Sequence, residues 1–554
     1  MASKKNKLRV FSLGGLQEIG KNITCFEYGQ DIIVVDCGIA FPEDDMLGID
    51  LVIPDFSYLV SNKHRVRAVI LTHGHEDHIG GLPYLLRDVE CPIYATRLTL
   101  GLLEIKLKEH RLNHVETICV AAGETVKIGN FKVEFIPVTH SIADAVAVAI
   151  KTPTSIAIHT GDFKIDHTPV DGARIDLQRF AELGCAGVDL LLCDSTNIEV
   201  PGYTMSERSV GEIFEQIFDK RTKNRIIIAS FSSNVHRIQQ VINSAAKHGR
   251  KVAVVGRSMV NSVRVAQELK YLTIPKKVMI ETSEIKNYPD DQIAIITTGS
   301  QGEPMSALTR MAMSDHKQVS IKPGDVVVVS ASWIPGNERA ISKVVDELFK
   351  RGADVVYDNL MHVHVSGHAN REDLKIIHAL VKPKYFMPVH GEYRHLKMHK
   401  ELALEMGMKK EDVFLVNLGE VLEIDRAGAK LNGTVPSGKL FVDGLGIGDV
   451  GNVVLRDRRH LSQDGLIVVV VTYDAATDEL SGPDFVSRGF VYMKESEDLI
   501  EGARCIVKKV FDRCGRENNY GLSHVKSSIK DELKDYVWQK TKRSPMILPY
   551  VVEI

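Results

Sequence analysis

The sequence predicts a mixed α/β protein in which a parallel, doubly wound α/β domain is inserted into a sheet-rich α+β domain, followed by a small α+β domain. Three observations predict this organisation. Short β-branched runs recur between glycine-rich turns up to about Thr196. Strands and helices alternate from Thr204 to about Tyr357, and short histidine-rich segments like those of the first part then return. We therefore expect a first domain made of residues 1–203 and 358–446, an inserted domain at 204–357 and a C-terminal domain at 447–554.

The predicted strands and helices follow from local patterns. In the first part, short apolar runs predict strands at Arg9–Leu13, Ile32–Asp36, Val66–Leu71, Lys132–Ile136 and Leu190–Asp194. A Thr-x-x-Glu capping box at Thr204–Glu207 predicts that a helix begins there. The inserted unit is then expected to contain strands Arg225–Ala229, Lys251–Val255, Ile293–Ile296 and Val326–Val329, a helix through Ile238 and Val241, and a helix Asn337–Lys350. After Gly446 we expect a glycine-rich connection, a strand at Leu466–Val471, two amphipathic helices and a final strand near Val551.

Composition sets limits on the class of protein. A chain of 554 residues with 44% hydrophobic and 25% charged residues is typical of a soluble protein of roughly three or four domains. It contains no apolar run long enough to cross a bilayer, and its basic start lacks the apolar segment of a secretory signal, so we expect a cytoplasmic protein. The formal charge of -3 excludes a uniformly basic nucleic-acid coat but allows a local electropositive groove.

Eight cysteines are scattered along the chain without a Cys-x-x-Cys pair. We expect them to be reduced core residues rather than zinc ligands or disulfides. They are Cys25, Cys37, Cys91, Cys119, Cys185, Cys193, Cys505 and Cys514.

The strongest chemical signal is the segment His73-Gly74-His75-Glu76-Asp77-His78, which directly follows the strand that ends at Leu71. Imidazole and carboxylate groups suit zinc or manganese, and side chains at a strand end can converge on one point. A two-metal site needs more ligands, which should come from other strand ends. Three candidates each follow a run that predicts a strand: His140 after Phe135–Thr139, Asp162 after Ala157–Gly161, and His390 after Tyr385–Val389. A buried histidine or a turn aspartate would explain any one of them alone.

These motifs resemble those of the metallo-β-lactamase superfamily, and the inserted unit with its later histidines is similar to the β-CASP branch of nucleic-acid processing nucleases. Within that branch the chain resembles bacterial ribonuclease J over essentially its whole length. The resemblance implies a metallo-β-lactamase αββα sandwich, an inserted doubly wound β-CASP domain and a small α+β C-terminal domain. The strings that carry the resemblance include Leu13–Asn22, Asp162–Lys164, Asp194–Asn197, Ser366–His368, His390–Arg394 and Pro545–Pro549.

The resemblance also implies a ligand set and roles. It assigns one zinc ion to His73, His75 and His140, a second to Asp77, His78 and His390, and a bridging position to Asp162. Asp194, His368 and His390 match the three β-CASP motifs. Two such ions would lower the pKa of a shared water toward about 7 and neutralise charge on an attacked phosphodiester. Asp77 would orient or deprotonate the water, Asp194 would support a ligand, and His368 would stabilise or protonate the leaving oxygen.

Two segments are expected to hold RNA. In Ser230–Arg237 a strand ends in the polar residues Ser232, Ser233 and Asn234 as a helix begins, which suits a phosphate but equally a plain helix cap. The resemblance assigns His364, Val365, Ser366, Gly367 and His368 to the substrate. A pocket for a terminal phosphate would explain 5′-to-3′ exonuclease action on 5′-monophosphorylated RNA beside endonuclease action, in RNA maturation and mRNA decay.

Further expectations are a structural calcium ion held by Gly48, Asp50 and Asp443, which the acidic loop and the resemblance suggest, and a homodimer or homotetramer formed through the C-terminal domain. RNA-degradation complex partners are compatible with the family. Two other functions stay open: a small-molecule hydrolase, because the histidine motif alone does not define a substrate, and a non-catalytic RNA-binding scaffold. DNA is also a possible substrate, because no contact to a ribose 2′-hydroxyl is identifiable.

Overall fold

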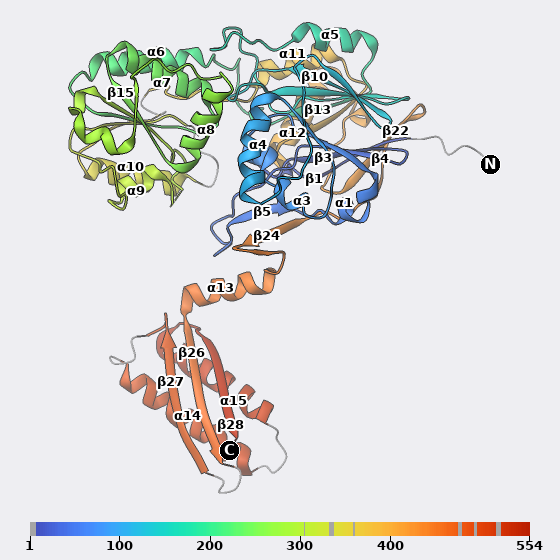
Figure 1. The fold of residues 1–554 in the computed structure, drawn as a ribbon. Coiled ribbons are helices and arrows are strands. Elements are labelled where there is room, and N and C mark those ends of the chain that lie inside the picture. The colour runs from blue at the N-terminus through green and yellow to red at the C-terminus, as the bar shows by residue number, and fades with distance from the viewer. Residues whose placement is uncertain are drawn as a thin grey trace. The chain divides into compact units, whose positions relative to one another are not determined.

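The structure is a computed structural model that describes residues 7–303, 305–331, 337–357, 361–474, 479–491, 496–516 and 522–553. The chain divides into two compact units, one made of Met1–Phe41 and Leu51–Leu440, the other of Pro42–Asp50 and Phe441–Ile554 (Figure 1). The expected boundary between residues 357 and 358 adjoins residues 358–360, which lie outside the described residues.

Two sheets form the centre of the first unit. The first has the order β23-β22-β1-β3-β4-β6-β7-β8 and the second the order β20-β13-β12-β11-β10-β9. The first sheet consists of β1 (Leu8–Gly14), β3 (Ile23–Tyr28), β4 (Asp31–Val35), β6 (Val66–Ile70), β7 (Ile93–Ala95), β8 (Thr117–Cys119), β22 (Glu420–Asp425) and β23 (Gly428–Thr434). The second consists of β9 (Thr125–Ile128), β10 (Phe131–Pro137), β11 (Val146–Lys151), β12 (Ile156–His159), β13 (Leu190–Asp194) and β20 (Tyr385–Val389).

The core between these sheets explains why they stack. Apolar side chains of both sheets, among them Phe26 and Phe135, form one buried cluster. A second buried cluster packs the other face of the second sheet against helices α5 (Leu177–Ala186), α11 (Arg371–Val381) and α12 (Tyr393–Glu405). Helices α1 (Ser57–Ser61), α3 (Leu82–Leu85) and α4 (Arg97–Glu109) lie beside the first sheet (Figure 1). The result is the expected helix–sheet–sheet–helix sandwich.

Short elements complete the sandwich. They are β2 (Leu16–Gln17), β5 (Leu51–Pro54), β21 (Gly391–Glu392), α2 (Glu76–Ile79) and the 3-10 turns Lys63–Arg65 and Lys410–Asp412.

A six-stranded, all-parallel sheet of order β16-β15-β17-β14-β18-β19 forms the inserted domain. Its strands are β14 (Ile226–Ala229), β15 (Lys251–Val255), β16 (Met279–Ile280), β17 (Ile293–Thr297), β18 (Val326–Val329) and β19 (Asp354–Tyr357). Helices α6 (Arg208–Lys220), α7 (Val235–Lys247) and α8 (Arg257–Glu268) lie on one face, and α9 (Ala307–Ala312) and α10 (Glu338–Lys350) on the other (Figure 1). The 3-10 turns Thr282–Asn287 and Asp290–Gln292 precede β17. Strands β13 and β20, which flank this insertion in the sequence, pair directly in parallel.

The second unit contains a three-stranded sheet of order β27-β26-β28, in which β26 (Leu466–Asp474) is antiparallel to β27 (Glu479–Arg488) and parallel to β28 (Met546–Glu553). Helices α14 (Glu497–Arg516) and α15 (Leu522–Thr541) bury their apolar sides against one face of this sheet. The strands β24 (Lys439–Asp443) and β25 (Gly446–Ile447) and helix α13 (Asn452–Asp464) precede it. Among the described helices, none is long and apolar enough to span a membrane.

The structure corrects three local predictions. Thr204 does not cap a helix, because α6 begins at Arg208 and the Thr204 hydroxyl instead donates to the carbonyl of His368, at 3.1 Å. Helix α13 occupies much of the region expected to be a glycine-rich connection. The cysteines are all free, but Cys119, Cys185 and Cys505 are exposed and are therefore not core residues.

Candidate metal centre

All seven residues that the sequence predicts as metal ligands lie together. They come from the ends of four strands and one short helix: His73 and His75 follow β6, Asp77 and His78 lie in α2, and His140, Asp162 and His390 follow β10, β12 and β20. Because these strands belong to both sheets, the site forms only when the sandwich is assembled.

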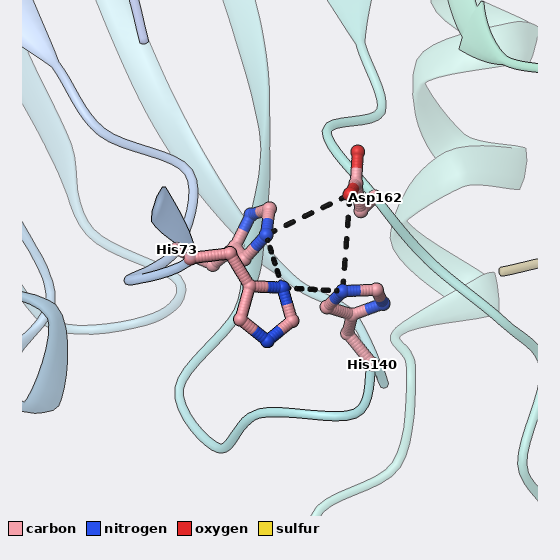
Figure 2. Close-up of side chains that lie close together, drawn as sticks. His73, His140 and Asp162 are labelled. Carbon is pink, nitrogen blue, oxygen red and sulfur yellow. Dashed lines mark hydrogen bonds and ion pairs between the residues drawn. The ribbon is translucent and has the colours of Figure 1, made fainter. Parts of the chain in front are cut away.

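Three histidines and Asp162 form the first group. The Nε2 atom of His73 lies 3.0 Å from Nδ1 of His75, which lies 3.1 Å from Nε2 of His140. The Oδ2 atom of Asp162 is 3.6 Å from Nε2 of His73 and 3.8 Å from Nε2 of His140. Figure 2 shows the rings of His73 and His140 turned toward this carboxylate.

The second group shares the same oxygen. Oδ2 of Asp162 lies 3.2 Å from Nε2 of His78 and 3.6 Å from Nε2 of His390. Oδ2 of Asp77 lies 3.2 Å from Nε2 of His390 and 3.5 Å from Nε2 of His78. Asp162 therefore stands between two clusters of donor atoms.

Asp36 fixes which nitrogen of two of these rings carries the proton. Its Oδ2 atom accepts a hydrogen bond from Nδ1 of His78 at 2.8 Å, so the Nε2 atom of His78 keeps its lone pair. The same oxygen accepts from the hydroxyl of Thr72, also at 2.8 Å. Because that hydroxyl has donated its proton, its oxygen accepts from Nδ1 of His73 at 3.0 Å, and Nε2 of His73 also keeps its lone pair.

Two further rings are held in the same tautomer. Nδ1 of His140 donates to the carbonyl oxygen of Gly367 at 2.7 Å. Nδ1 of His390 lies 2.6 Å from the hydroxyl of Thr196, which itself donates to Oδ1 of Asp194 and so accepts from the ring. In their neutral forms the four rings consequently direct their Nε2 lone pairs at Asp162.

The spacing of the donor nitrogens and oxygens suits a bound metal ion better than it suits direct contacts between these atoms. Two imidazole nitrogens that both keep lone pairs repel at about 3 Å unless a cation lies between them. A tetrahedral ion with ligand bonds of about 2.1 Å places neighbouring donor atoms about 3.4 Å apart, and the separations in both groups lie between 3.0 and 3.8 Å. Nitrogen and carboxylate oxygen are ligands that zinc prefers.

Burial favours the neutral rings that a metal requires in the first group. It is the main cause that lowers the pKa of His75 to about 4 and holds the pKa of His73 well below its ordinary value, so both rings are neutral. Burial opposes the charged form of Asp162, but the neighbouring His390 and His78 outweigh it and hold the pKa of that carboxyl well below its usual range. Neutral imidazole and ionised carboxylate are the forms that bind metal. In the second group the nearby carboxylates of Asp162 and Asp77 outweigh burial, and they raise the pKa of His390 to about 9 and that of His78 well above its ordinary value. A metal ion would therefore displace a proton from each of these two rings.

Asp194 and His368 border the second group. Nδ1 of His368 donates to Oδ2 of Asp194 at 2.7 Å. Burial lowers the pKa of His368, but the charge of Asp194 and its hydrogen bond outweigh this and raise it above the ordinary value. Both residues therefore lie beside the donor cluster, where the sequence places them.

The segments predicted to hold RNA are partly engaged within the chain. Oδ1 of Asn234 accepts from the backbone N–H of Arg237 at 3.0 Å, so Asn234 does cap helix α7. Ser366 accepts through its hydroxyl from the N–H of His368 at 3.2 Å. The side chain of Arg237 lies 2.8 Å from Nδ1 of His364, which places the start of α7 beside the His364–His368 segment.

Sequence reasoning missed the residues behind the ligands. Asp36 and Thr72 carry no motif, and Thr196 lies in the Asp194–Asn197 string without a role assigned to it. Asp36 directly follows the strand β4, which is the same signal that identified Asp162. Asn22 was also missed, and its Nδ2 atom lies 3.3 Å from Oδ2 of Asp77.

The residues predicted to hold calcium have partners within the second unit. Oδ2 of Asp50 accepts from the N–H of Gly444 at 2.8 Å, and Asp443 pairs with the guanidinium of Arg458. Arg458 also donates to the carbonyl of Leu47 at 3.0 Å, next to Gly48. Within the described ranges, the groups of three or more residues able to hold a metal do not include these carboxylates.

Comparison with family models divides the chain among four known domains. Residues 32–217 match the beta-lactamase superfamily domain and residues 223–348 the beta-CASP domain of ribonuclease J. Residues 353–416 match the Zn-dependent metallo-hydrolase RNA specificity domain, and residues 453–554 match the ribonuclease J C-terminal domain.

Whole-chain comparisons agree. The chain is 46% identical to ribonuclease J2 of Bacillus subtilis, over 100% of both chains, and 46% identical to ribonuclease J 1 of Streptococcus pyogenes, over 99% of this chain and 98% of the relative. It is 42% identical to ribonuclease J of Thermus thermophilus, over 99% of this chain and 96% of the relative. A crystal structure of a protein of unknown function from Enterococcus faecalis shares the fold, with a TM-score of 0.56 and 18% identity over 76% of this chain and 100% of that one.

The histidine and aspartate clusters, the RNA specificity domain and the full-length relatives agree on one assignment. The chain belongs to the ribonuclease J family, and it is a zinc-dependent, RNA-specific metallo-hydrolase with a metallo-β-lactamase domain, a β-CASP domain and a ribonuclease J C-terminal domain.

Proposed function

We propose that this nuclease degrades RNA in the 5′-to-3′ direction, with a preference for 5′-monophosphorylated ends, and also cleaves internally. Attack of water in line with the leaving oxygen would give products with a 5′ phosphate and a 3′ hydroxyl. Such an activity serves RNA maturation, including that of ribosomal RNA, and mRNA decay in the cytoplasm. The observation that carries the proposal is the convergence of four imidazole lone pairs on Asp162.

The donor set supports two zinc ions. One would be held by His73, His75 and His140, the other by Asp77, His78 and His390, with Asp162 shared between them. Manganese is an alternative for the same nitrogen and oxygen donors. Bound zinc supplies Lewis acidity, which lowers the pKa of water and offsets the negative charge that develops on an attacked phosphodiester.

The chain's own residues would orient the reacting groups. The carboxylate of Asp77 is partly exposed, with 31% of its side-chain surface accessible, and is available to orient or deprotonate a water. His368 donates through Nδ1 to Asp194, which leaves Nε2 for the substrate. A raised pKa favours the protonated ring of His368, which suits it to give a proton to the leaving oxygen. Asp194 would hold both His368 and, through Thr196, His390 in position.

The RNA phosphates would lie between two segments. Ser232, Ser233 and Asn234 precede helix α7, so their polar side chains stand at the N-terminal end of a helix, which favours an anion. His364, Val365, Ser366, Gly367 and His368 form the second segment, which reaches the metal ligands because the Gly367 carbonyl accepts from His140.

The direct test is product analysis on RNA labelled at the 5′ end and carrying either a monophosphate or a triphosphate. We expect zinc-dependent release of mononucleotides from the monophosphorylated RNA, slower attack on the triphosphorylated end, and loss of both in chelator. Binding of RNA without release of nucleotides in the presence of zinc or manganese would refute the proposal and favour an RNA-binding scaffold.

The role of His368 has its own test. His368→Ala should lose most turnover while it keeps its zinc content, because all seven proposed ligands remain, and Nδ1 of His368 lies 2.7 Å from Asp194 but 3.9 Å from Oδ2 of Asp162. His248→Ala is a matched control, since His248 also pairs with an aspartate, Asp219, at 2.8 Å but on the inserted domain. Full turnover in His368→Ala would remove the proposed role.

We also propose a homodimer or homotetramer formed through the C-terminal domain. On β26 and β28 the buried residues alternate with residues on the opposite face, because successive side chains of a strand point to opposite sides. That opposite face exposes Leu548 and Tyr550, by 47% and 61%, and Val486 of β27 by 44%. Deletion of the residues after Gly446 should lower the mass in solution to that of a monomer, and an unchanged oligomer would contradict the proposal.

We also propose domain boundaries at residues 203/204, 357/358 and 446/447, a calcium ion at Gly48, Asp50 and Asp443, and partners in an RNA-degradation complex. Calcium binding to the full-length protein, and its loss in Asp50→Asn, would test the ion site.

A further inference from the structure

A fully buried arginine lies behind the proposed RNA segment. Arg237 has 0% of its surface exposed and lies in the first turn of α7, where its backbone N–H is capped by Asn234. A buried guanidinium is costly unless its donors are all satisfied. Its surroundings therefore indicate what it holds in place.

The guanidinium binds two elements at once. On one side Nε and Nη2 donate to Oε1 and Oε2 of Glu207, both at 2.9 Å, in a bidentate pair. On the other side Nη1 donates to Nδ1 of His364 and to the carbonyl of Ser330, both at 2.8 Å, and Nη2 reaches the carbonyl of Val365 at 3.4 Å. Only the planar fork of an arginine reaches these acceptors together.

This contact sets the tautomer of His364. A guanidinium only donates, so Nδ1 of His364 must accept and the ring proton lies on Nε2. Burial, aided by the charge of Arg237, holds the pKa of His364 well below its ordinary value, so the ring is neutral. Among the described residues, the ring of His364 makes its hydrogen bond through Nδ1. Its Nε2–H group is therefore the one that can donate to a phosphate oxygen.

The same segment leads to the catalytic centre. The carbonyl of Val363 accepts from the hydroxyl of Ser330 at 2.5 Å, and the carbonyl of Gly367 accepts from Nδ1 of His140 at 2.7 Å. The chain between these two anchors carries His364. Arg237 therefore contacts the middle of the segment Val363–Gly367, which connects Ser330 of the inserted domain to the proposed metal ligand His140.

We propose that Arg237, locked by Glu207, is a positioning residue for RNA binding: it presents His364 as an Nε2–H donor and fixes the backbone at Val365. The inference deepens the proposed function, because it rests on the assignment of the His364–His368 segment to RNA. It requires no contact between Arg237 and the substrate, since the arginine acts through His364.

Arg237→Lys tests this role because lysine keeps the positive charge beside Glu207 but lacks the fork. Arg225→Lys is the matched control. Arg225 is also buried and pairs with Asp325 through Nε at 3.0 Å, but it precedes β14 and thus lies at the opposite end of that strand from Arg237. Glu207→Gln is a second variant, which removes the charge partner and keeps the side-chain shape.

Steady-state kinetics of the zinc-loaded full-length enzymes would use RNA with a 5′ monophosphate and RNA with a 5′ hydroxyl. We expect Arg237→Lys to raise KM about tenfold with kcat changed less than about threefold, Glu207→Gln to have a smaller effect of the same kind, and Arg225→Lys to leave KM unchanged. Nitrogen NMR of histidine-labelled enzyme should show His364 protonated at Nε2 in the unmodified chain and a mixture of tautomers in Arg237→Lys.

The outcomes separate the two proposals. A wild-type enzyme that treats both RNA ends alike would overturn the proposed end preference, while the KM change and the tautomer would still decide the role of Arg237. An unchanged KM in Arg237→Lys, an equal rise in Arg225→Lys, or a proton on Nδ1 of His364 in the unmodified chain would each refute the positioning role.

Discussion

Asp36→Asn should weaken zinc binding although Asp36 is not among the predicted ligands. Its two oxygens accept three hydrogen bonds, from the N–H and hydroxyl of Thr72 and from Nδ1 of His78, all at 2.8 Å. An asparagine has the same shape and tolerates the positive φ of 61° at this position, so the backbone need not change. One of its terminal atoms, however, becomes an NH2 group that faces donors.

The size of the effect follows from that mismatch. If the amide oxygen stays on the Thr72 N–H, the NH2 group faces Nδ1 of His78, and the ring must move its proton to Nε2, the nitrogen directed at Asp162. Loss of such a supporting partner weakens metal binding by about 10- to 100-fold, or about 1.4 to 2.7 kcal/mol. We expect that loss for the zinc that contacts His78.

Zinc competition against a chelating dye, on the full-length protein, would measure this change. Asp31→Asn is the control, because Asp31 lies at the other end of the same strand β4 and accepts from Arg67 at 2.6 Å and from the N–H of Asn130 at 2.9 Å. It should lower stability without a change in zinc affinity. Wild-type zinc affinity in Asp36→Asn, or an equal loss in Asp31→Asn, would refute the reasoning.

Two further substitutions test packing and charge. In Gly367→Ala the new Cβ would lie 2.6 Å from Cε1 of His140, so the ring must shift and turnover should fall on the order of 10- to 100-fold. Gly451→Ala is the control: its new Cβ would meet no atom within 4 Å, so turnover should stay unchanged. Burial opposes the charge of Glu27, but hydrogen bonds from Tyr58 and a neighbouring arginine outweigh it and lower its pKa. The folded-state pKa of Glu27 thus lies below the unfolded value of about 4.3. Glu27→Gln should therefore lower the free energy of unfolding by about 1 to 3 kcal/mol at pH 7. Thermal melts should show this difference between the two proteins vanish as the pH falls through the folded-state pKa of Glu27. A difference that persists at low pH would contradict the charge argument.

Short-range signals in the sequence identified the candidate ligands. The spacing of His73, His75 and His78 is visible within six positions, and Asp162 and His390 each follow a predicted strand. Strand ends in a layered α/β fold meet at the edges of their sheets, so the joint placement of these residues could be inferred before any coordinates were known.

Long-range contacts were not predictable in the same way. The Thr204–Glu207 string matches a capping box, yet Thr204 binds the carbonyl of His368 and Glu207 binds Arg237. A local pattern cannot show that a polar side chain has a better partner 164 residues away. Helix α13 differs from its prediction for another reason: Gly451 and Gly465 are typical of a glycine-rich connection, but in the structure they mark the two ends of a helix.

The pairing of β13 with β20 has a consequence for synthesis of the protein. Residues 194 and 389 are neighbours in the sheet, but the whole inserted domain is made between them. A ribosome-bound chain that ends before Tyr385 lacks β20 of one sheet, β22 and β23 of the other, and the ligand His390 of one metal group. Since domains generally fold as units from the N-terminus during translation, the inserted domain is in place before the metal centre can close. The order of strands thus delays completion of the metal centre until His390, some two hundred residues after β13, has been synthesised.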